Sequence, residues 1–142
     1  MSNPEDQQQS HQQVQQVQQL WAIDAGVSSY VAVGQRAVTS LKNIANATAE
    51  GMGLNLSYQV IMADPDQAND VIAETIDEEG NIVSVDFTGG YTRMDNVLVN
   101  TAIPVFLTFK KPGTYIFTLQ LYHTDTKTVL AEDIEIAVAV RL

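Results

Sequence analysis

The clearest pattern in the chain is a strict alternation of apolar and polar side chains near its C-terminal end. Between residues 114 and 122 every second side chain is a large apolar one: Tyr115, Phe117, Leu119 and Leu121. After the polar residues 124–127, a second run alternates in the same way, and its expected core face is Ile134, Ile136, Val138 and Val140. Alternation with a period of two is typical of strands that cover a core on one side. The two runs therefore predict a long antiparallel hairpin.

Shorter runs of the same kind precede this hairpin. Residues 54–62 alternate clearly, and residues 71–76 and 82–87 flank a loop that contains Gly80-Asn81, a pair typical of hairpins. Residues 97–99 and 103–109 predict one further strand or a bulged pair, in which Pro104 suggests an edge or an irregularity. Six or seven short strands at regular intervals predict a mainly β protein with an antiparallel β-sandwich over residues 54–142. The sandwich could be immunoglobulin-like or a jelly roll.

The segment 22–53 has a different pattern. Its apolar residues follow a spacing of three or four, which is typical of one helix face: Val33, Ala37, Val38, Leu41, Ile44 and Ala45. Gly51-Met52-Gly53 then supplies a helix end. These features predict a helix from Gln35 to Ala49, while residues 29–33 could instead form a short strand.

Residues 1–21 form a glutamine-rich arm. Such a composition buries too little apolar surface to order itself, and a plain flexible tail is one interpretation. The apolar residues of the arm nevertheless fall at helical spacing, so the alternative is a short helix that orders against a partner. The candidate partner-binding residues are Val14, Val17, Leu20 and Trp21. Trp21, where the arm meets the folded part, could equally belong to the core.

Charge and composition exclude several classes of function. The formal net charge is −10, with only seven lysine and arginine residues in 142, so a phosphate backbone is an improbable partner and no nucleic acid is expected. The chain has no cysteine for disulfides or thiolate metal sites. The sequence lacks an apolar run of membrane-spanning length, and the acidic first residues do not resemble a signal peptide. We therefore expect no membrane partner and synthesis in the cytoplasm.

Candidate chemistry is sparse. Of the two histidines, His11 lies in the arm and His123 at a strand end, and neither belongs to a nucleophile motif. The sequence therefore predicts a protein without catalytic residues or a cofactor. Three acids, Asp64, Asp66 and Asp70, could together supply oxygen ligands for Ca²⁺, although solvated loop acids are the favoured interpretation because no calcium-loop motif surrounds them.

The stretch Phe109-Lys110-Lys111-Pro112-Gly113-Thr114-Tyr115-Ile116-Phe117 and the return strand Leu130 to Val140 resemble immunoglobulin-like sandwich domains of bacteria and tailed phages. The arm followed by an acidic β body also resembles capsid decoration or cement proteins of tailed phages. This resemblance implies a non-enzymatic virion accessory protein that docks on capsid or other virion proteins through its arm and helix, with the virion as its location and the cytoplasm as the alternative. A homo-oligomer is expected because symmetric oligomers are common. The alternative function is a ligand- or glycan-binding module, with Ca²⁺ at the three aspartates.

Overall fold

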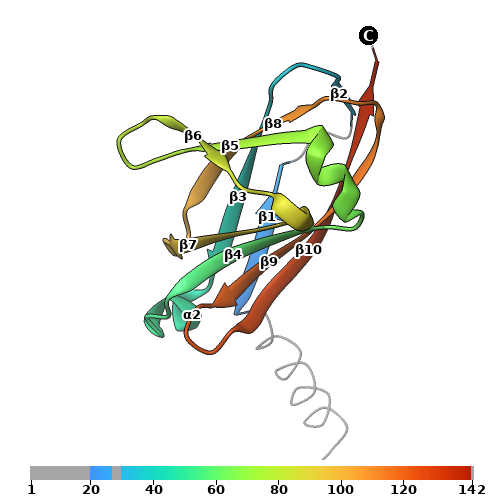
Figure 1. Ribbon diagram of the computed structural model, residues 1–142. Helices are drawn as coiled ribbons and strands as arrows, with labels where there is room; N and C mark the ends of the chain where they lie inside the picture. Colours follow the sequence, from blue (N-terminus) through green and yellow to red (C-terminus); the bar gives the residue numbers. More distant parts are fainter. Residues whose placement is uncertain (1–19, 27–29, 142) are drawn as a thin grey trace, which may run out of the picture.

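Two five-stranded sheets packed face to face form the body of the protein in the computed structural model, which describes residues 20–26 and 30–141 (Figure 1). The first sheet has the order β1 (Trp21–Ala25), β3 (Ala37–Ala45), β8 (Ala102–Phe109), β5 (Val71–Ile76) and β6 (Ile82–Val85). The second has the order β2 (Tyr30–Ala32), β10 (Thr128–Val140), β9 (Gly113–His123), β4 (Leu56–Met62) and β7 (Tyr91–Val97). The helical pieces described are α2 (Ala47–Gly51) and the 3₁₀ helices η1 (Pro65–Asp70) and η2 (Thr88–Gly90). The predicted antiparallel β-sandwich is therefore confirmed.

The C-terminal hairpin of β9 and β10 is present as predicted, paired from Thr128 opposite His123 to Ala139 opposite Gly113. All four apolar residues of the alternating β9 face are buried, as expected. Strands β4, β5 and β6 also occur within one or two residues of their predicted bounds. The loop between β5 and β6 is closed by Asp77, whose carboxylate accepts hydrogen bonds from the backbone N–H groups of Glu79 and Asn81.

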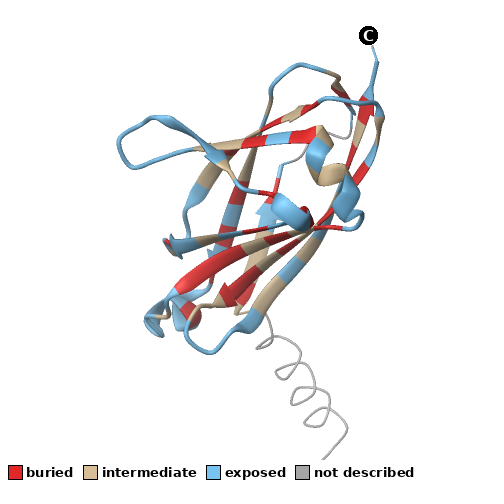
Figure 2. Ribbon diagram, viewed as in Figure 1, coloured by how far each residue is buried: buried red, intermediate tan, exposed pale blue. Residues whose placement is uncertain are grey.

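The core lies between the sheets and draws on the inner face of each (Figure 2). Its largest fully buried side chains include Tyr58, Phe109 and Tyr115. The rings of Phe109 and Tyr115 lie 4.5 Å apart, which joins β8 of the first sheet to β9 of the second. Complete burial of one large apolar side chain stabilises a fold by about 1.5–3 kcal/mol, so these aromatic residues hold the two sheets together.

The predicted helix from Gln35 to Ala49 is wrong. Most of that segment is strand β3, and only α2, which begins after the cap residue Asn46, is helical. In β3 the buried positions are Leu41, Asn43 and Ala45, which alternate as a strand requires. The alternation is hidden in the sequence because Asn43 is polar although it is completely buried, and Ile44 is apolar although it is exposed. The short strand suggested for residues 29–33 is confirmed by β2.

The segment 22–53 is consequently part of the sandwich and not a separate helical region. Strand β1 joins the first sheet beside β3, while β2 joins the second sheet and pairs in parallel with β10. A tyrosine corner, which is a feature of immunoglobulin-like domains, is present: the Tyr115 hydroxyl donates a hydrogen bond of 2.7 Å to the carbonyl of Lys111, four residues earlier.

The predicted core face of β10 is also wrong. Its buried residues are Ala137 and Ala139, whereas Ile134 and Ile136 are more than half exposed. Directly paired residues on neighbouring strands share a face, and Ile136 lies opposite Ile116, an outward residue of β9. The buried inward positions, Ala137 and Ala139, hold small side chains, and β1 lies in contact with β10. The inward residue before them, Glu135, is only partly buried. The larger residues of β10 are therefore left on the surface.

Strand β7 was not predicted, because its sequence, Tyr91-Thr92-Arg93-Met94-Asp95-Asn96-Val97, mixes polar and apolar residues on both faces. Residues 98 and 99 lie in the connection that follows it and not in a strand. Pro104 suggests an edge or an irregularity in the sequence, and β8 is not an edge strand but lies in the middle of the first sheet. The missing N–H of Pro104 is tolerated because the β5 ladder ends at the neighbouring pair, Thr75 and Val105.

Candidate functional site

The outer face of the second sheet divides into an apolar half and a polar half. The apolar half, here called the isoleucine face, comprises outward residues of β2, β10 and β9: Tyr30, Ile116, Ile134, Ile136, Val138 and Val140. Tyr30 is 74% exposed and Ile134 is 58% exposed. β-branched side chains are favoured in strands, but strand propensity does not explain why so many apolar side chains are exposed together on one face.

Charged groups are absent from the isoleucine face itself, whose first charged outward residue along β10 is Glu132. The outer face of the first sheet differs in this respect. There the apolar side chains Val38 and Phe106 lie among charged ones, and the Arg36 guanidinium stacks 5.5 Å from the ring of Phe106 while pairing with Glu74. Contact surfaces are typically apolar and poor in charged residues, so the isoleucine face fits this description better than the outer face of the first sheet.

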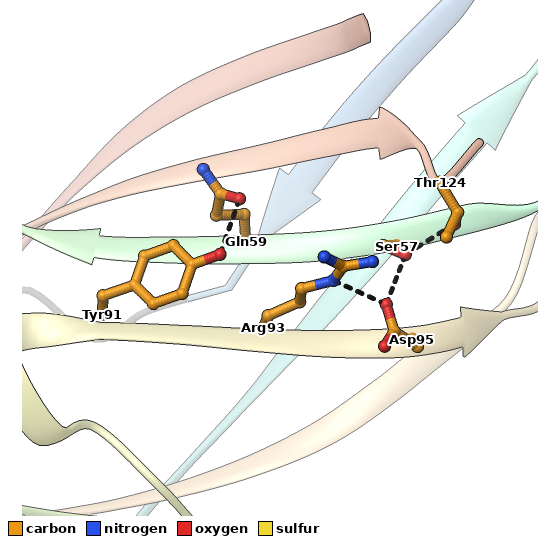
Figure 3. A network of polar contacts seen from close by, with 6 residues as sticks. All are labelled: Ser57, Gln59, Tyr91, Arg93, Asp95 and Thr124. Atoms are coloured by element: carbon orange, nitrogen blue, oxygen red, sulfur yellow. Dashed lines mark hydrogen bonds and ion pairs between the residues drawn. The ribbon is translucent and has the colours of Figure 1, made fainter. Parts of the chain in front are cut away.

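The polar half contains a ladder of amide side chains that crosses four strands. The Tyr91 hydroxyl donates to Gln59 Oε1 at 2.9 Å (Figure 3), Gln59 Nε2 donates to Gln120 Oε1 at 2.9 Å, and Gln120 Nε2 donates to Glu132 Oε2 at 3.0 Å. An ionised carboxylate such as that of Glu132 can only accept hydrogen bonds. Gln120 must therefore donate to it, and this fixes the orientation of both amides.

A second group of polar side chains lies beside the ladder. Arg93 Nε and Ser57 Oγ both donate to Asp95 Oδ1 at 2.8 Å, and Ser57 Oγ lies 2.6 Å from Thr124 Oγ1 (Figure 3). The hydrogen bond from Ser57, followed by that from Arg93, lowers the pKa of Asp95. A carboxylate with a lowered pKa is a weak general base, and Ser57 is completely buried, so this group is suited to binding and not to acid–base catalysis.

A cavity of about 200 Å³ opens over these side chains. We call it the amide pocket, and it is lined by Gln59, Tyr91, Arg93, Gln120, Tyr122, Lys127 and Val129. The Arg93 side chain reaches across β4 and places its guanidinium 5.3 Å from the centre of the Tyr122 ring, which holds the cation in place. Two of the seven lysine and arginine residues of this acidic chain therefore line a single cavity.

Two of the four predicted partner-binding residues, Leu20 and Trp21, lie among the described residues. Trp21 is buried in the core at the start of β1, so it is a core residue and not an anchor for a partner. Leu20 is partly buried against the same core. Val14 and Val17 lie outside the described residues.

None of the described helices is long and apolar enough to cross a membrane.

The three aspartates considered for Ca²⁺ do not gather into one site. Asp64 caps η1 by accepting a hydrogen bond from the backbone of Asp66, and Asp70 lies 3.5 Å from the Lys111 ammonium group. Within residues 20–26 and 30–141, no group of three potential ligands could hold a metal ion. His123, expected as a solvated turn residue, is partly buried and bonds through Nδ1 to the Thr126 hydroxyl.

A small pocket of about 40 Å³ lies between the sheets, and its lining is apolar except for Thr39, Thr92 and Glu135. Glu135 lies on the inward face of β10, opposite Phe117 of β9. Partial burial raises its pKa above the usual 4.5, and the hydrogen bond to Asp133 and the negative charges of Asp133 and Asp24 raise it further. The ionised form of Glu135 is therefore disfavoured in the folded state.

The consequence is a pH-dependent effect of Glu135 on stability. A carboxyl group with a raised pKa in the fold costs nothing below its unfolded pKa and destabilises the fold as the pH rises through its folded pKa. We expect Glu135→Gln to raise the melting temperature at neutral pH by about 2 °C and to have no effect near pH 4. Thermal melts at both pH values test this, with Glu78→Gln in the exposed β5–β6 loop as control. An equal gain at both pH values would contradict the electrostatic cause.

Comparisons with known proteins identify the fold but no family. No family model matches the chain, and no curated protein is significantly similar in sequence. Among solved structures, a cohesin module from the family 33 glycoside hydrolase of Clostridium perfringens has a TM-score of 0.58 at 12% identity, covering 87% of this chain and 98% of that one. A conjugative transposon lipoprotein from Bacteroides eggerthii has a TM-score of 0.54 at 10% identity, covering 84% and 97%. AvmM, which catalyses macrocyclization in alchivemycin A biosynthesis, has a TM-score of 0.52 at 9% identity, covering 84% and 88%.

All three resemble this chain in fold, at identities of 12% or less. The likeness therefore establishes the immunoglobulin-like fold and leaves function to be argued from the surface of this chain. None of the three is described as a phage decoration protein.

Sequence reasoning missed both halves of the outer face. The alternation in β10 predicts Ile134, Ile136, Val138 and Val140 as core residues, and the amide pocket depends on β7, which the sequence does not predict. The sequence of β7 gives no clear strand signal, because each face combines a polar side chain with an apolar or aromatic one: Tyr91 with Arg93, and Thr92 with Met94.

Proposed function

We propose that this chain is a non-enzymatic interaction module that associates with a second copy of itself through the isoleucine face. The observation that carries the proposal is the row of six outward apolar side chains without an intervening charge. Each copy has a formal net charge of −10, so a stable contact must bring together surfaces that carry no charge of their own. The isoleucine face meets this condition, because it pairs with its own copy without placing carboxylates opposite one another.

The polar groups next to this face support a binding role over a catalytic one. Ser57 is buried, its hydroxyl donates to the carboxylate of Asp95, and that carboxylate is held ionised by its partners. His123 bonds to the hydroxyl of Thr126 and lies 3.5 Å from Asp125, and its contacts are with these turn residues and not with Ser57. This arrangement lacks the nucleophile and base pairing on which acyl or glycosyl transfer depends.

The expected association is weak. Six side chains are far fewer than the roughly 20–30 residues that each partner contributes to a standard interface, so we expect a dissociation constant in the micromolar range or weaker. Association should strengthen when salt is added, because mobile ions screen the repulsion between two negatively charged copies. A contact based on ion pairs would weaken instead.

Light scattering of the full chain at increasing concentration tests the proposal. The mass should rise above 15.5 kDa, the mass of one copy, and a double variant Ile134→Thr/Ile136→Thr should stay at that mass. Threonine keeps the strand propensity while removing apolar surface. The matched control is Val38→Thr/Ile72→Thr, which alters exposed residues on the outer face of the first sheet and should associate like the wild type. A wild-type chain that stays monomeric, or two double variants that behave alike, would overturn the proposal.

A virion accessory protein would be one specific kind of interaction module, and this role stays a prediction. It supposes a protein assembly as the partner, which agrees with the interaction surface proposed here. The contact differs from the one first expected, because Trp21 is buried in the core and the exposed apolar residues lie on β2, β9 and β10. The virion and, alternatively, the cytoplasm remain the proposed locations.

A further inference from the structure

The amide pocket has the size and lining of a site for a small polar ligand. Its volume of about 200 Å³ lies below the range of about 300–1,000 Å³ that is usual for drug-sized ligands. One sugar ring or one short side chain is therefore the scale of group that it accommodates. Six of the seven lining residues lie on strands, and the register of β7, β4 and β9 fixes the positions of five of them, while Lys127 comes from the β9–β10 turn.

The ladder leaves specific hydrogen-bonding capacity free. A glutamine amide has two N–H donors and an oxygen with two lone pairs. Gln59 uses one N–H for Gln120 and accepts from Tyr91, while Gln120 uses one N–H for Glu132 and accepts from Gln59. The inter-strand bonds thus use only part of each amide, and a ligand hydroxyl, which both donates and accepts, matches what remains.

The charge of the pocket lining favours a ligand that carries a negative charge. Arg93 and Lys127 are the charged residues that line the pocket, and both are cations. Arg93 donates through Nε to Asp95 and lies over the Tyr122 ring, so its guanidinium is fixed before any ligand arrives. A guanidinium held through Nε still presents its terminal N–H groups, which are suited to a carboxylate. Lys127 projects from the β9–β10 turn, where its backbone has a positive φ of 58°.

The side of the pocket also offers apolar contact. The Tyr91 side chain is 41% exposed and hydrogen-bonded through its hydroxyl, which leaves the ring surface free for stacking. Val129, which lines the pocket beside the β9–β10 turn, is also exposed. Sugar rings combine apolar faces with hydroxyl edges, and this combination matches a lining that offers an aromatic ring, an exposed valine and two amides.

We propose that the amide pocket binds an acidic saccharide, with the carboxylate of a uronic acid residue at Arg93 and Lys127 and its hydroxyls at Gln59 and Gln120. This function is separate from self-association, because the pocket residues are not those of the isoleucine face. The two proposals can therefore fail independently.

Isothermal titration calorimetry of the full chain with a galacturonate trimer tests the proposal. We expect a dissociation constant of about 1 mM or tighter, and weaker binding at higher salt. Lys127→Asn, which suits the positive φ, and Arg93→Gln, which can still donate to Asp95, should each weaken binding about tenfold, the usual loss for one charge-assisted hydrogen bond. Lys42→Asn, an exposed lysine on β3 in the first sheet, is the matched control and should not change binding.

Several outcomes would overturn the assignment. If a neutral galactose trimer bound equally well, Arg93 and Lys127 would not recognise a carboxylate. If a glutamate tripeptide bound more tightly than the galacturonate trimer, the pocket would be a peptide site and not a saccharide site. Wild-type affinity in Lys127→Asn would place the saccharide elsewhere, and no heat of binding at about 10 mM, ten times the expected dissociation constant, would exclude the site. Light scattering of Lys127→Asn should match the wild type, which separates this result from the test of self-association.

Discussion

Replacing Asn43 by alanine should destabilise the fold by about 3 kcal/mol, the largest effect expected for a polar residue of this chain. Asn43 is completely buried in β3. Its Nδ2 donates to the Tyr58 hydroxyl at 3.1 Å and to the Leu98 carbonyl at 2.8 Å, and its Oδ1 accepts from the Asn100 N–H at 2.7 Å. One side chain therefore connects the first sheet to β4 of the second and to the connection between β7 and β8.

The expected loss is large because alanine leaves three partners without a hydrogen bond in a place that water does not reach. An unsatisfied buried polar group costs about 1–3 kcal/mol. Burial already raises the pKa of Tyr58, which marks the poor solvation around its hydroxyl. The Asn100 side chain accepts in turn from the backbone N–H of Ala45, so the loss also loosens the β7–β8 connection.

Urea unfolding of Asn43→Ala measures this loss. Asn55→Ala is the matched control, since Asn55 is exposed and its amide bonds to Asp125 at 3.2 Å, and its cost should stay below about 0.5 kcal/mol. Tyr58→Phe removes one of the three hydrogen bonds and should cost about 1 kcal/mol. A loss below about 1 kcal/mol in Asn43→Ala would mean that water enters the site and replaces the amide.

The same residue shows where sequence reasoning stops. A buried amide looks like a surface position in a hydrophobic pattern, and its partners Tyr58, Leu98 and Asn100 are distant in sequence. With position 43 read as polar, the remaining apolar residues of β3 fit a helical spacing. Strands β4 and β9 were predicted correctly because their inward residues are all large and apolar, so local pattern and tertiary burial agree.

The error in β10 has a different physical origin. Both faces of this strand carry apolar residues, and the sequence favours the larger ones for the core. The structure buries the small residues Ala137 and Ala139, and β1 lies in contact with β10. The spacing between the two sheets cannot be inferred from the sequence of one strand. The sequence therefore could not show that the larger apolar residues of β10 are exposed.

The amide pocket was hidden for a related reason. Its lining residues come from β4, β7, β9, the β9–β10 turn and the start of β10, and none of them stands out from its neighbours in the sequence. Only the register, which places Gln59 opposite Arg93 on one side and opposite Gln120 on the other, assembles them. A binding site made across strands therefore leaves no motif in the sequence, in contrast to one made by a single loop.

Gly90→Ala should destabilise the fold by about 3 kcal/mol, and the cause is steric. Gly90 ends η2 with φ at +79°, and a Cβ atom placed there would lie 2.7 Å from the Cα of Pro65 and 3.1 Å from its Cβ. Pro65 begins η1, so the clash is with backbone that cannot rotate away. The positive φ adds about 1–2 kcal/mol for any residue with a Cβ, and the overlap adds a similar amount.

Gly89→Ala separates these two causes. Gly89 has nearly the same positive φ, +75°, but a Cβ there would meet no atom within 4 Å, so only the backbone cost of about 1 kcal/mol should appear in urea unfolding. Equal losses in the two variants would contradict a close approach of η1 and η2. Because Gly90 directly precedes Tyr91 of β7, its displacement should also move the Tyr91 hydroxyl away from Gln59. We therefore expect Gly90→Ala, unlike Gly89→Ala, to weaken the binding of a ligand in the amide pocket. The close packing of η1 and η2 thus supports the geometry of the binding surface.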